Sequence, residues 1–237
     1  MNRQALTGLV GVAALVIAAC GTSTPSAGGK PLIAEPTTGV TFSEDFNPYD
    51  SNSVAAAMGT RSMVNEPLIE FDQLDATPAG THPWLATAYA FQNGGKDLQV
   101  TIRENVKFSD GSAFAPADVA ATFKMMKKNP KANIRGVPPQ AADPTVSGNN
   151  VTLHFASPQY TGLFNILCNT FMLKASMADQ IAQNEKIAIK VPLGTGPFML
   201  DSYSSSVIKW KPNPNYWGGT PPESAIWTPS IATNAAA

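Results

Sequence analysis

The stretch Thr-Ile-Arg-Glu-Asn-Val-Lys-Phe-Ser-Asp-Gly occupies residues 101–111 and decides the fold around it. It continues an alternation of apolar and polar residues over 98–103, which is typical of a half-buried β-strand. Its Asp-Gly pair readily supplies the positive φ that a tight turn needs. Pro116 and Asp118 suit the first turn of a helix, where proline needs no N–H partner and a carboxylate faces the positive end of the dipole. The stretch therefore predicts a strand, a turn and a helix that runs to about residue 128.

The flanking sequence predicts more elements of both kinds, and so a mixed α/β fold. The predicted strands lie at 31–34, 67–72, 88–91, 146–147, 151–155, 198–201 and 207–211, and the other predicted helices at 53–63, 159–167 and 175–183. After Gly219 the pattern of strands and helices does not continue. We therefore expect an irregular tail over residues 220–237.

The first twenty residues have the pattern of a signal peptide. Arg3 precedes an apolar run over 6–19, which is shorter than the roughly 20 residues that a permanent transmembrane helix needs. The tetrapeptide Ile-Ala-Ala-Cys at 17–20 resembles the bacterial lipobox, which implies that Cys20 is acylated and becomes the lipid anchor. The alternative is an ordinary secretory signal that contains a cysteine by chance. Residues 21–30 are rich in Gly, Ser, Thr and Pro, which predicts a flexible tether.

Composition argues against several classes of function. The chain has 237 residues and a formal net charge of -1, so nothing electrostatic favours nucleic acid or an anionic membrane surface as a partner. Cys168 is the only cysteine besides Cys20, so lipidation of Cys20 would leave no intramolecular disulfide. We interpret Cys168 as a small apolar residue of the interior, with a reactive thiol as the less favoured alternative.

The residues of an enzyme site are also missing from the sequence. The two histidines, His82 and His154, have no spacing typical of a zinc site, and the chain contains neither a Gly-x-Ser-x-Gly motif nor a phosphate-binding P-loop. We expect His154, inside a predicted strand, to face solvent or a hydrogen-bond partner. The sequence thus predicts no catalytic residues, no metal and no cofactor, and a hydrolase is the least favoured hypothesis.

Three sets of segments together resemble family 5 of the bacterial extracellular solute-binding proteins, the oligopeptide, dipeptide and nickel type. The resemblance covers residues 31–219. It rests on Glu-Pro-Leu-Ile at 66–69 with Pro-Trp-Leu-Ala at 83–86, on 101–111 with Ala-Asp-Val at 117–119, and on Gly-Thr-Gly-Pro-Phe at 194–198 with Asn-Pro-Asn-Tyr-Trp-Gly-Gly at 213–219.

This resemblance implies a fold of the α/β (α+β mixed) class, like the first lobe of a type II periplasmic binding protein. Proteins of this kind close two lobes on a solute. Residues 31–64 and 193–219 would form a partial lobe I, and residues 65–192 an inserted mixed-sheet domain. The second lobe has no counterpart in this sequence, so we expect an N-terminal portion of a longer protein, or a truncated one.

The resemblance also implies a function and a site. It predicts the substrate-binding component of an ABC importer, which captures peptides outside the cytoplasmic membrane and delivers them to permease subunits. The protein would be a monomer, held by its lipid on the outer side of that membrane, in the periplasmic space. An oligosaccharide ligand is the alternative, as is an envelope lipoprotein remnant that does not transport. Thr41, Phe42 and Ser43 are the predicted ligand-binding residues, because family members line their cleft with this loop.

Other motif residues are interpreted as scaffold. Aromatic residues and glycines at turns fix the direction of the chain, so we expect structural roles for Trp84, Trp217, Gly194 and Gly196. Ala115 departs from the family, which usually has Thr or Ser there to cap the following helix. This loss is expected to cost about 1 kcal/mol of local stability.

Overall fold

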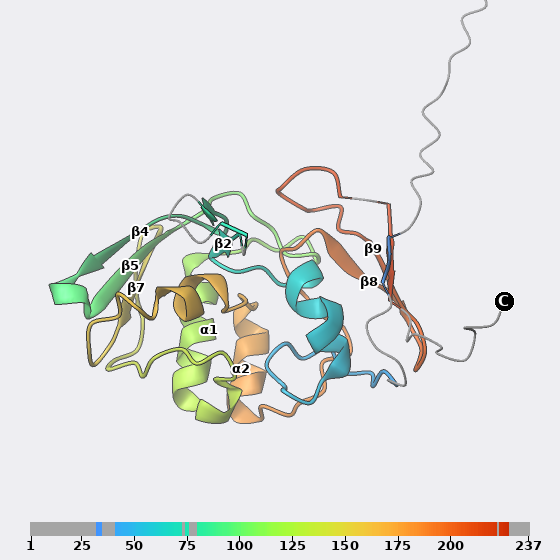
Figure 1. Ribbon diagram of the computed structural model, residues 1–237, viewed down its shortest axis with the longest axis horizontal. Helices are drawn as coiled ribbons and strands as arrows, with labels where there is room; N and C mark the ends of the chain where they lie inside the picture. Colours follow the sequence, from blue (N-terminus) through green and yellow to red (C-terminus); the bar gives the residue numbers. More distant parts are fainter. Residues whose placement is uncertain (1–31, 35–40, 73, 76–79, 222, 228–237) are drawn as a thin grey trace, which may run out of the picture.

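The computed structural model of the protein describes residues 32–34, 41–72, 74–75, 80–221 and 223–227 (Figure 1). The predicted signal peptide, Cys20 and the tether at 21–30 lie outside these ranges. Among the helices that are described, none is both long and apolar enough to cross a membrane.

One sheet brings together strands from both ends of the described chain. Its strand order is β1-β10-β9-β8, and β1 runs parallel to β10 whereas the other pairs are antiparallel. Its members are β1 (Leu32–Ala34), β8 (Phe198–Tyr203), β9 (Ile208–Pro212) and β10 (Ala225–Trp227). The π-helix η1 (Ala56–Val64) packs against β8, at the right of Figure 1.

Strand β10 corrects the expectation of an irregular tail over residues 220–237. Residues 225–227 pair on one side with β1 and on the other with β9, so both edges of this short strand are bonded. A strand of three residues carries almost no periodic signal of its own. Pairing with segments distant in the sequence decides its conformation.

The second sheet belongs to the middle of the chain. Its strands are antiparallel and follow the order β4-β5-β7-β6. They are β4 (Ala86–Gln92), β5 (Asp97–Ile102), β6 (Thr145–Ser147) and β7 (Asn150–His154). The helices α1 (Pro116–Lys128) and α2 (Ala175–Gln183) lie side by side, and α1 packs on β6 and β7 (Figure 1).

Short elements complete this part of the molecule. Strands β2 and β3 form a separate antiparallel pair. The bounds are β2 (Ile69–Phe71), β3 (Thr81–Pro83), the 3₁₀ turns η3 (Asn93–Gly95) and η4 (Pro130–Ala132), and the π-helical turn η5 (Phe164–Cys168).

The predicted helices and strands agree with these elements except at 159–167, whereas strands β3 and β10 were not predicted. The helices expected at 116–128 and 175–183 have those bounds, and both predicted hairpins form. The helix expected at 159–167 is wrong, because only η5 forms. The Gln159 N–H donates instead to the Gly95 carbonyl at 2.9 Å, which ties this segment to η3 as a turn.

The buried apolar side chains form two cores. The large core takes its members from Leu68 to Ile189 together with Tyr49, and the small core takes them from 42–64 and 198–225. The sequence predicted one part made of residues 31–64 with 193–219, and a second part made of residues 65–192. The two cores follow this division, except that Tyr49 belongs to the large core. It remains a prediction about domains.

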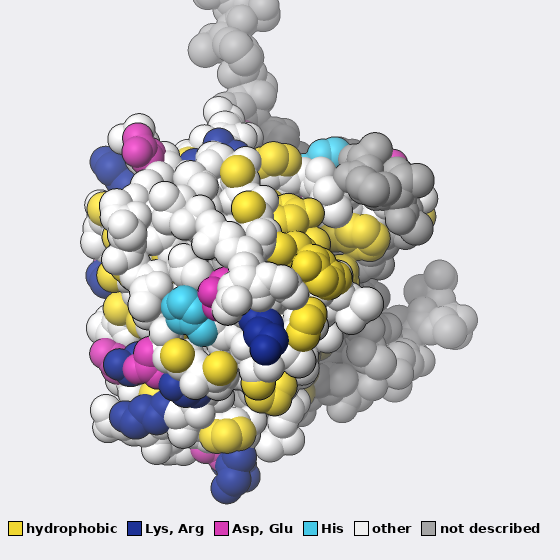
Figure 2. All heavy atoms as spheres, turned by 90° about the vertical axis from the view of Figure 1, so that its left-hand side faces the viewer, with side chains coloured by type: hydrophobic (Ala, Val, Ile, Leu, Met, Phe, Trp, Pro, Cys, Tyr) yellow, Lys and Arg dark blue, Asp and Glu magenta, His cyan; other side chains and the backbone are white. Residues whose placement is uncertain are grey.

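The surface beside the second sheet is mixed in character. Figure 2 shows Lys and Arg side chains interspersed with Asp and Glu on this face, next to a patch of hydrophobic side chains. Tyr89, on β4, and Tyr160 are large hydrophobic residues that are exposed. Nucleic-acid binding usually depends on a continuous basic patch, whereas the visible charges here alternate in sign.

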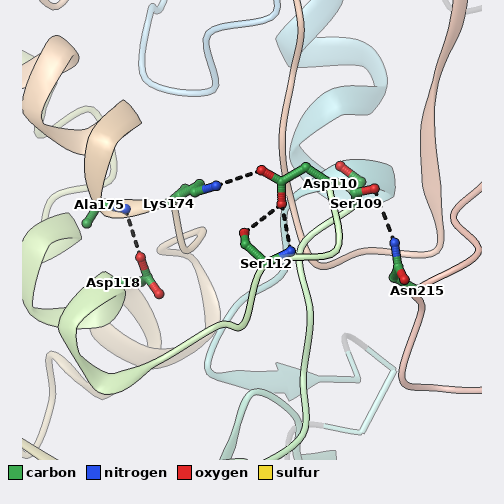
Figure 3. Close-up of polar contacts among 7 residues, drawn as sticks. All are labelled: Ser109, Asp110, Ser112, Asp118, Lys174, Ala175 and Asn215. Carbon is green, nitrogen blue, oxygen red and sulfur yellow. Dashed lines mark hydrogen bonds and ion pairs between the residues drawn. The ribbon is translucent and has the colours of Figure 1, made fainter.

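One carboxylate serves the starts of both helices. Asp118 accepts a hydrogen bond from the Ala115 N–H at 2.8 Å, and its other oxygen accepts one from the Ala175 N–H at 2.8 Å (Figure 3). Ala115 is the N-cap of α1, in extended conformation, and gives the helix no side-chain acceptor. Half of a capping box is therefore present. The sequence predicted the missing acceptor at Ala115, but not the hydrogen bond from its N–H to Asp118.

Ala115→Ser is expected to raise the free energy of unfolding by about 1 kcal/mol, because the hydroxyl can accept a hydrogen bond from a free N–H of the first turn. Urea denaturation measures this change. Ala117→Ser is the matched control, because it adds the same hydroxyl at an exposed position inside the helix. Equal effects of the two substitutions would contradict the capping argument.

The turn at the end of residues 101–111 is fastened to α2 by an ion pair. Asp110 accepts hydrogen bonds from Lys174 Nζ at 2.6 Å and from the Ser112 N–H at 3.0 Å (Figure 3). The Lys174 hydrogen bond, helped by Ser112, lowers the pKa of Asp110 to about 2. Gly111 has φ +83°, as the Asp-Gly turn predicted.

This ion pair predicts a pH-dependent stability. A carboxyl whose pKa is lower in the folded than in the unfolded chain stabilises the fold above its unfolded pKa, and this contribution is lost as the pH falls through the folded value. The stability difference between the wild type and Asp110→Asn should therefore shrink between about pH 5 and pH 2. Urea denaturation across this range measures it. Lys174→Gln should show the same trend, and a constant difference would contradict the assignment.

Candidate functional site

A buried carboxylate connects distant segments at the centre of the site. Glu66 is 3% exposed, and it accepts hydrogen bonds from Trp84 Nε1 at 2.7 Å and from Trp217 Nε1 at 3.0 Å. The two indole rings pack edge to face, with centroids 5.0 Å apart. Burial raises the pKa of Glu66, while the hydrogen bonds from its neighbours oppose this rise. Glu66 thus joins three of the motifs found in the sequence.

Arg103 brings the 101–111 stretch to the same cluster. Its guanidinium carbon lies 4.4 Å from the centroid of the Trp217 ring, within the range of a cation–π contact. Its Nε donates to the Trp84 carbonyl at 2.5 Å, and its Nη2 donates to the Pro83 carbonyl at 3.2 Å. These contacts hold Trp84 and Trp217 in place, as their interpretation as scaffold predicted.

The glycine motif at 194–198 is packed against the end of η1. The Gly196 N–H donates to the Val64 carbonyl at 2.9 Å, and the Gly194 carbonyl accepts from the Ser109 N–H at 2.9 Å. A Cβ atom on Gly194 would lie 1.8 Å from the Val64 oxygen. Only glycine fits there, so Gly194 and Gly196 have the structural roles expected of them.

A cavity of about 380 Å³ opens beside Glu66. This volume lies within the range of small-molecule sites. Its aromatic wall consists of Phe71, Trp84, Phe164, Phe171 and Tyr216. Such a wall offers large apolar contact area with few flexible bonds.

The charges on the wall of this cavity are negative. Glu66 and the exposed Glu70 both line it, and neither lysine nor arginine is among its lining residues. Burial, together with the negative charge of Glu66 and a hydrogen bond to that carboxylate, raises the pKa of Tyr216, so its hydroxyl stays protonated. The cavity therefore suits a ligand with a cationic or hydrogen-bonding group and apolar surface.

Cys168 also lines this cavity. It is a free, partly buried cysteine, and burial raises the pKa of its thiol to about 11. A protonated thiol is a poor nucleophile. This agrees with the interpretation of Cys168 as a small apolar residue.

One arginine lies over a ring of the aromatic wall, and a second arginine lies on η1. Arg135 lies over the ring of Phe171, with its guanidinium carbon 5.2 Å from the ring centroid. The Tyr49 hydroxyl donates to the Phe171 carbonyl at 2.6 Å, so the backbone at this point of the wall is fixed. Arg61, on η1, donates from Nε to the Pro48 carbonyl at 2.9 Å. Burial, and then the positive charge of Arg135, lowers the pKa of Arg61 to about 10.

The predicted ligand-binding loop lies elsewhere. Phe42 is 2% exposed in the small core, and its carbonyl accepts a hydrogen bond from the Tyr203 hydroxyl at 2.7 Å. Thr41 and Ser43 are exposed. None of the three lines the cavity beside Glu66. A ligand contact by this loop remains a prediction, and Phe42→Ala would perturb the core in any case.

Sequence reasoning did not single out Arg61 or Arg135 as site residues, and it treated Glu66 only as part of a motif. A weak signal was available, because Arg61 is the only charged residue in the otherwise uncharged segment 53–63. Charged residues are rarely buried unless they are paired or functional.

His154 has hydrogen-bond partners on both ring nitrogens. Its Nδ1 lies 2.9 Å from Asp97 Oδ1, and its Nε2 lies 3.1 Å from Thr145 Oγ1. This agrees with the expected satisfied histidine. Within the described ranges, no group of three or more His, Cys, Asp or Glu side chains is placed to hold a metal ion.

Comparison with protein families gives a match over residues 80–236, more than half of the chain, to the model described as bacterial extracellular solute-binding proteins, family 5 middle. Among curated proteins, the chain is 31% identical over 169 residues to the nickel-binding periplasmic protein of Escherichia coli, covering 69% of this chain and 31% of that protein. It is 29% identical over 161 residues to the glutathione-binding protein GsiB of E. coli, covering 63% and 30%. The chain thus matches about a third of the length of these relatives.

Solved structures share the fold. A periplasmic oligopeptide-binding protein of an ABC transporter from Thermotoga maritima, solved with mannohexaose bound, aligns with a TM-score of 0.72 at 24% identity over 87% of this chain and 39% of that one. A dipeptide-binding protein from Pseudoalteromonas sp. SM9913 in complex with Met-Leu aligns with a TM-score of 0.69 at 19% identity over 85% and 43%. The relatives named here are binding proteins, not enzymes.

Proposed function

Because the chain belongs to family 5 of the bacterial extracellular solute-binding proteins, we propose that it is part of the substrate-binding component of an ABC importer, and that it captures peptides outside the cytoplasmic membrane and delivers them to permease subunits. The observation that carries the peptide assignment is the cavity beside Glu66. It combines an aromatic wall with the carboxylates of Glu66 and Glu70. A peptide offers matching groups, since it has an N-terminal ammonium, apolar side chains and amide hydrogen-bonding groups.

An oligosaccharide is the second candidate ligand. The aromatic wall favours it, because flat rings can stack on the apolar faces of sugars. The fold relative from T. maritima, solved with mannohexaose, also supports this alternative. The carboxylates beside the aromatic wall favour the peptide, since a neutral sugar does not neutralise buried negative charge.

Isothermal titration calorimetry on the full-length native protein tests the proposal. The panel contains di- to pentapeptides, glutathione, mannohexaose and Ni²⁺. Heat with peptides and none with mannohexaose is the expected result. Binding of mannohexaose alone would replace the peptide assignment by the sugar one. A folded protein that binds none of these compounds and does not co-purify with permease subunits would instead be an envelope lipoprotein that does not transport.

The proposed location is the outer side of the cytoplasmic membrane, with Cys20 as lipid anchor. The lipobox-like residues 17–20 support it. Mass spectrometry of the protein extracted from cells tests it, because processing would leave an acylated Cys20 at the N-terminus. A Cys20→Ala protein should then be released from the membrane fraction.

A further inference from the structure

Strand β4 forms an open edge of the second sheet. It lies at the end of the strand order β4-β5-β7-β6, and within the described ranges no strand pairs with its other side (Figure 1). An edge strand directs the N–H and C=O groups of every second residue away from its sheet, where a further strand can bind them. At the start of β4, the Ala86 N–H donates to the Leu68 carbonyl at 2.8 Å. Beyond Ala86, no described backbone group outside the sheet bonds to the strand.

Most of β4 lacks the features that usually protect a sheet edge. Soluble proteins shorten their edge strands, or place charged residues, proline or bulges in them. The irregularity in the pairing of β4 lies at its start, between Ala86 and Ala88, and residues 88–92 then pair one to one with β5. The strand has seven residues, and the sequence carries no charged side chain from 83 to 95. The opposite edge, β6, has only three residues, so its length protects it.

The side chains of β4 form an aromatic face and a face of small residues. Tyr89 and Phe91 point to one face, because successive side chains of a strand alternate, and Ala88 and Ala90 point to the other. Tyr89 is 38% exposed. The Phe91 ring packs edge to face with the ring of Tyr160, with centroids 4.7 Å apart, and Tyr160 is 59% exposed. Aromatic rings therefore lie at the open edge, where a further strand would cover them.

The strand is complementary to itself. Two identical strands that pair antiparallel are related by a two-fold axis, so each presents the same surface to the other. With Ala90 on this axis, Tyr89 of one copy lies opposite Phe91 of the second copy, and this pair occurs twice. Aromatic cross-strand pairs of this kind stabilise a sheet. Like charges directly opposite each other would destabilise it, and the uncharged segment 83–95 brings none together.

We propose that two copies of the protein associate through their β4 strands, which pair antiparallel about Ala90 and join the two four-stranded sheets into one continuous sheet. The partner is a second copy of this chain, and the inference does not depend on which ligand the protein captures. It departs from the monomer that the family resemblance implied. Anchoring of both copies in one membrane through Cys20, as proposed above, would favour the pairing, because it raises their effective concentration.

Analytical ultracentrifugation of the full-length native protein, over a series of concentrations, tests the proposal. We expect the mass of one chain on dilution and a mass approaching twice that value at high concentration. Ala90→Lys should weaken the association at least about tenfold, because two like charges would meet on the two-fold axis. Ser147→Lys is the matched control. It adds the same charge at an exposed position of β6, the opposite edge of the sheet, and should leave the association unchanged.

Opposite charges at the same position give a sharper test of the pairing. A mixture of the Ala90→Lys and Ala90→Glu proteins should associate more tightly than either variant alone, because the two charges then attract each other across the axis. A mixture that associates no more tightly than the separate variants would overturn pairing about Ala90. The proposal as a whole is overturned if the wild type keeps the mass of one chain at every concentration, or if Ala90→Lys associates as the wild type does.

Thermal unfolding of the dilute proteins checks that the variants fold. Ala90 is exposed, so Ala90→Lys should melt close to the wild type. If Ala90→Lys does not fold, hydrogen exchange of the wild type replaces it. The amide protons of residues 87–92 that point away from β5 should exchange more slowly at high than at low protein concentration, because the second copy then binds them. Equal exchange at both concentrations would overturn the proposal.

Discussion

Glu66→Ala is expected to lower the free energy of unfolding by about 3 kcal/mol, because two indole N–H groups would lose their acceptor while remaining packed together. This loss of stability includes the cost of the cavity left by the Glu66 side chain, which is 3% exposed. For a chain of this size, the melting temperature should fall by about 6–12 °C. Thermal unfolding followed by circular dichroism measures it.

Glu70→Ala is the matched control for this substitution. Glu70 lines the same cavity and carries the same charge, but it is exposed. Its removal should change the stability by no more than about 0.5 kcal/mol. A Glu66→Ala protein as stable as Glu70→Ala would show that the carboxylate does not hold the two tryptophans together.

Gly194→Ala is expected to destabilise the protein by about 3 kcal/mol or more. The added Cβ would lie 1.8 Å from the Val64 carbonyl oxygen, and a backbone atom cannot rotate away as the end of a side chain can. The strain arises where the end of η1 contacts the glycine motif, next to the hydrogen bond from the Gly196 N–H to the Val64 carbonyl. Urea denaturation at constant pH measures the loss.

Gly148→Ala separates this clash from the general cost of replacing a glycine. A Cβ on Gly148 meets nothing within 4 Å, although its φ of +56° is unfavourable for alanine. Its expected cost is about 1 kcal/mol. If both alanine variants lost the same stability, the contact with Val64 would not be the cause.

These predictions assign structural roles to the motif residues. Glu66, Trp84, Arg103 and Trp217 hold the segments of the fold together. Their contacts also hold Trp84, one ring of the aromatic wall, in place. The residues by which the family resemblance is seen are therefore mainly those that build the scaffold.

Periodic local patterns predicted much of the secondary structure. The helices at 116–128 and 175–183 and the hairpin strands around residues 97–103 and 145–154 follow from alternation, proline placement and turn residues. Such signals arise within a few residues of each other, so a sequence contains them in full. The order of the motifs was also enough to indicate the family.

The sequence by itself thus determined the mixed α/β class, most element positions and the family resemblance. Only the tertiary structure decided that 225–227 is a strand, that Phe42 is buried, and that Arg135 stands over Phe171. The physical reason is separation along the chain. Glu66 and Trp217 are 151 residues apart, and β1 pairs with β10 across most of the sequence. Contacts of this kind depend on how the whole chain packs, and no local pattern encodes them.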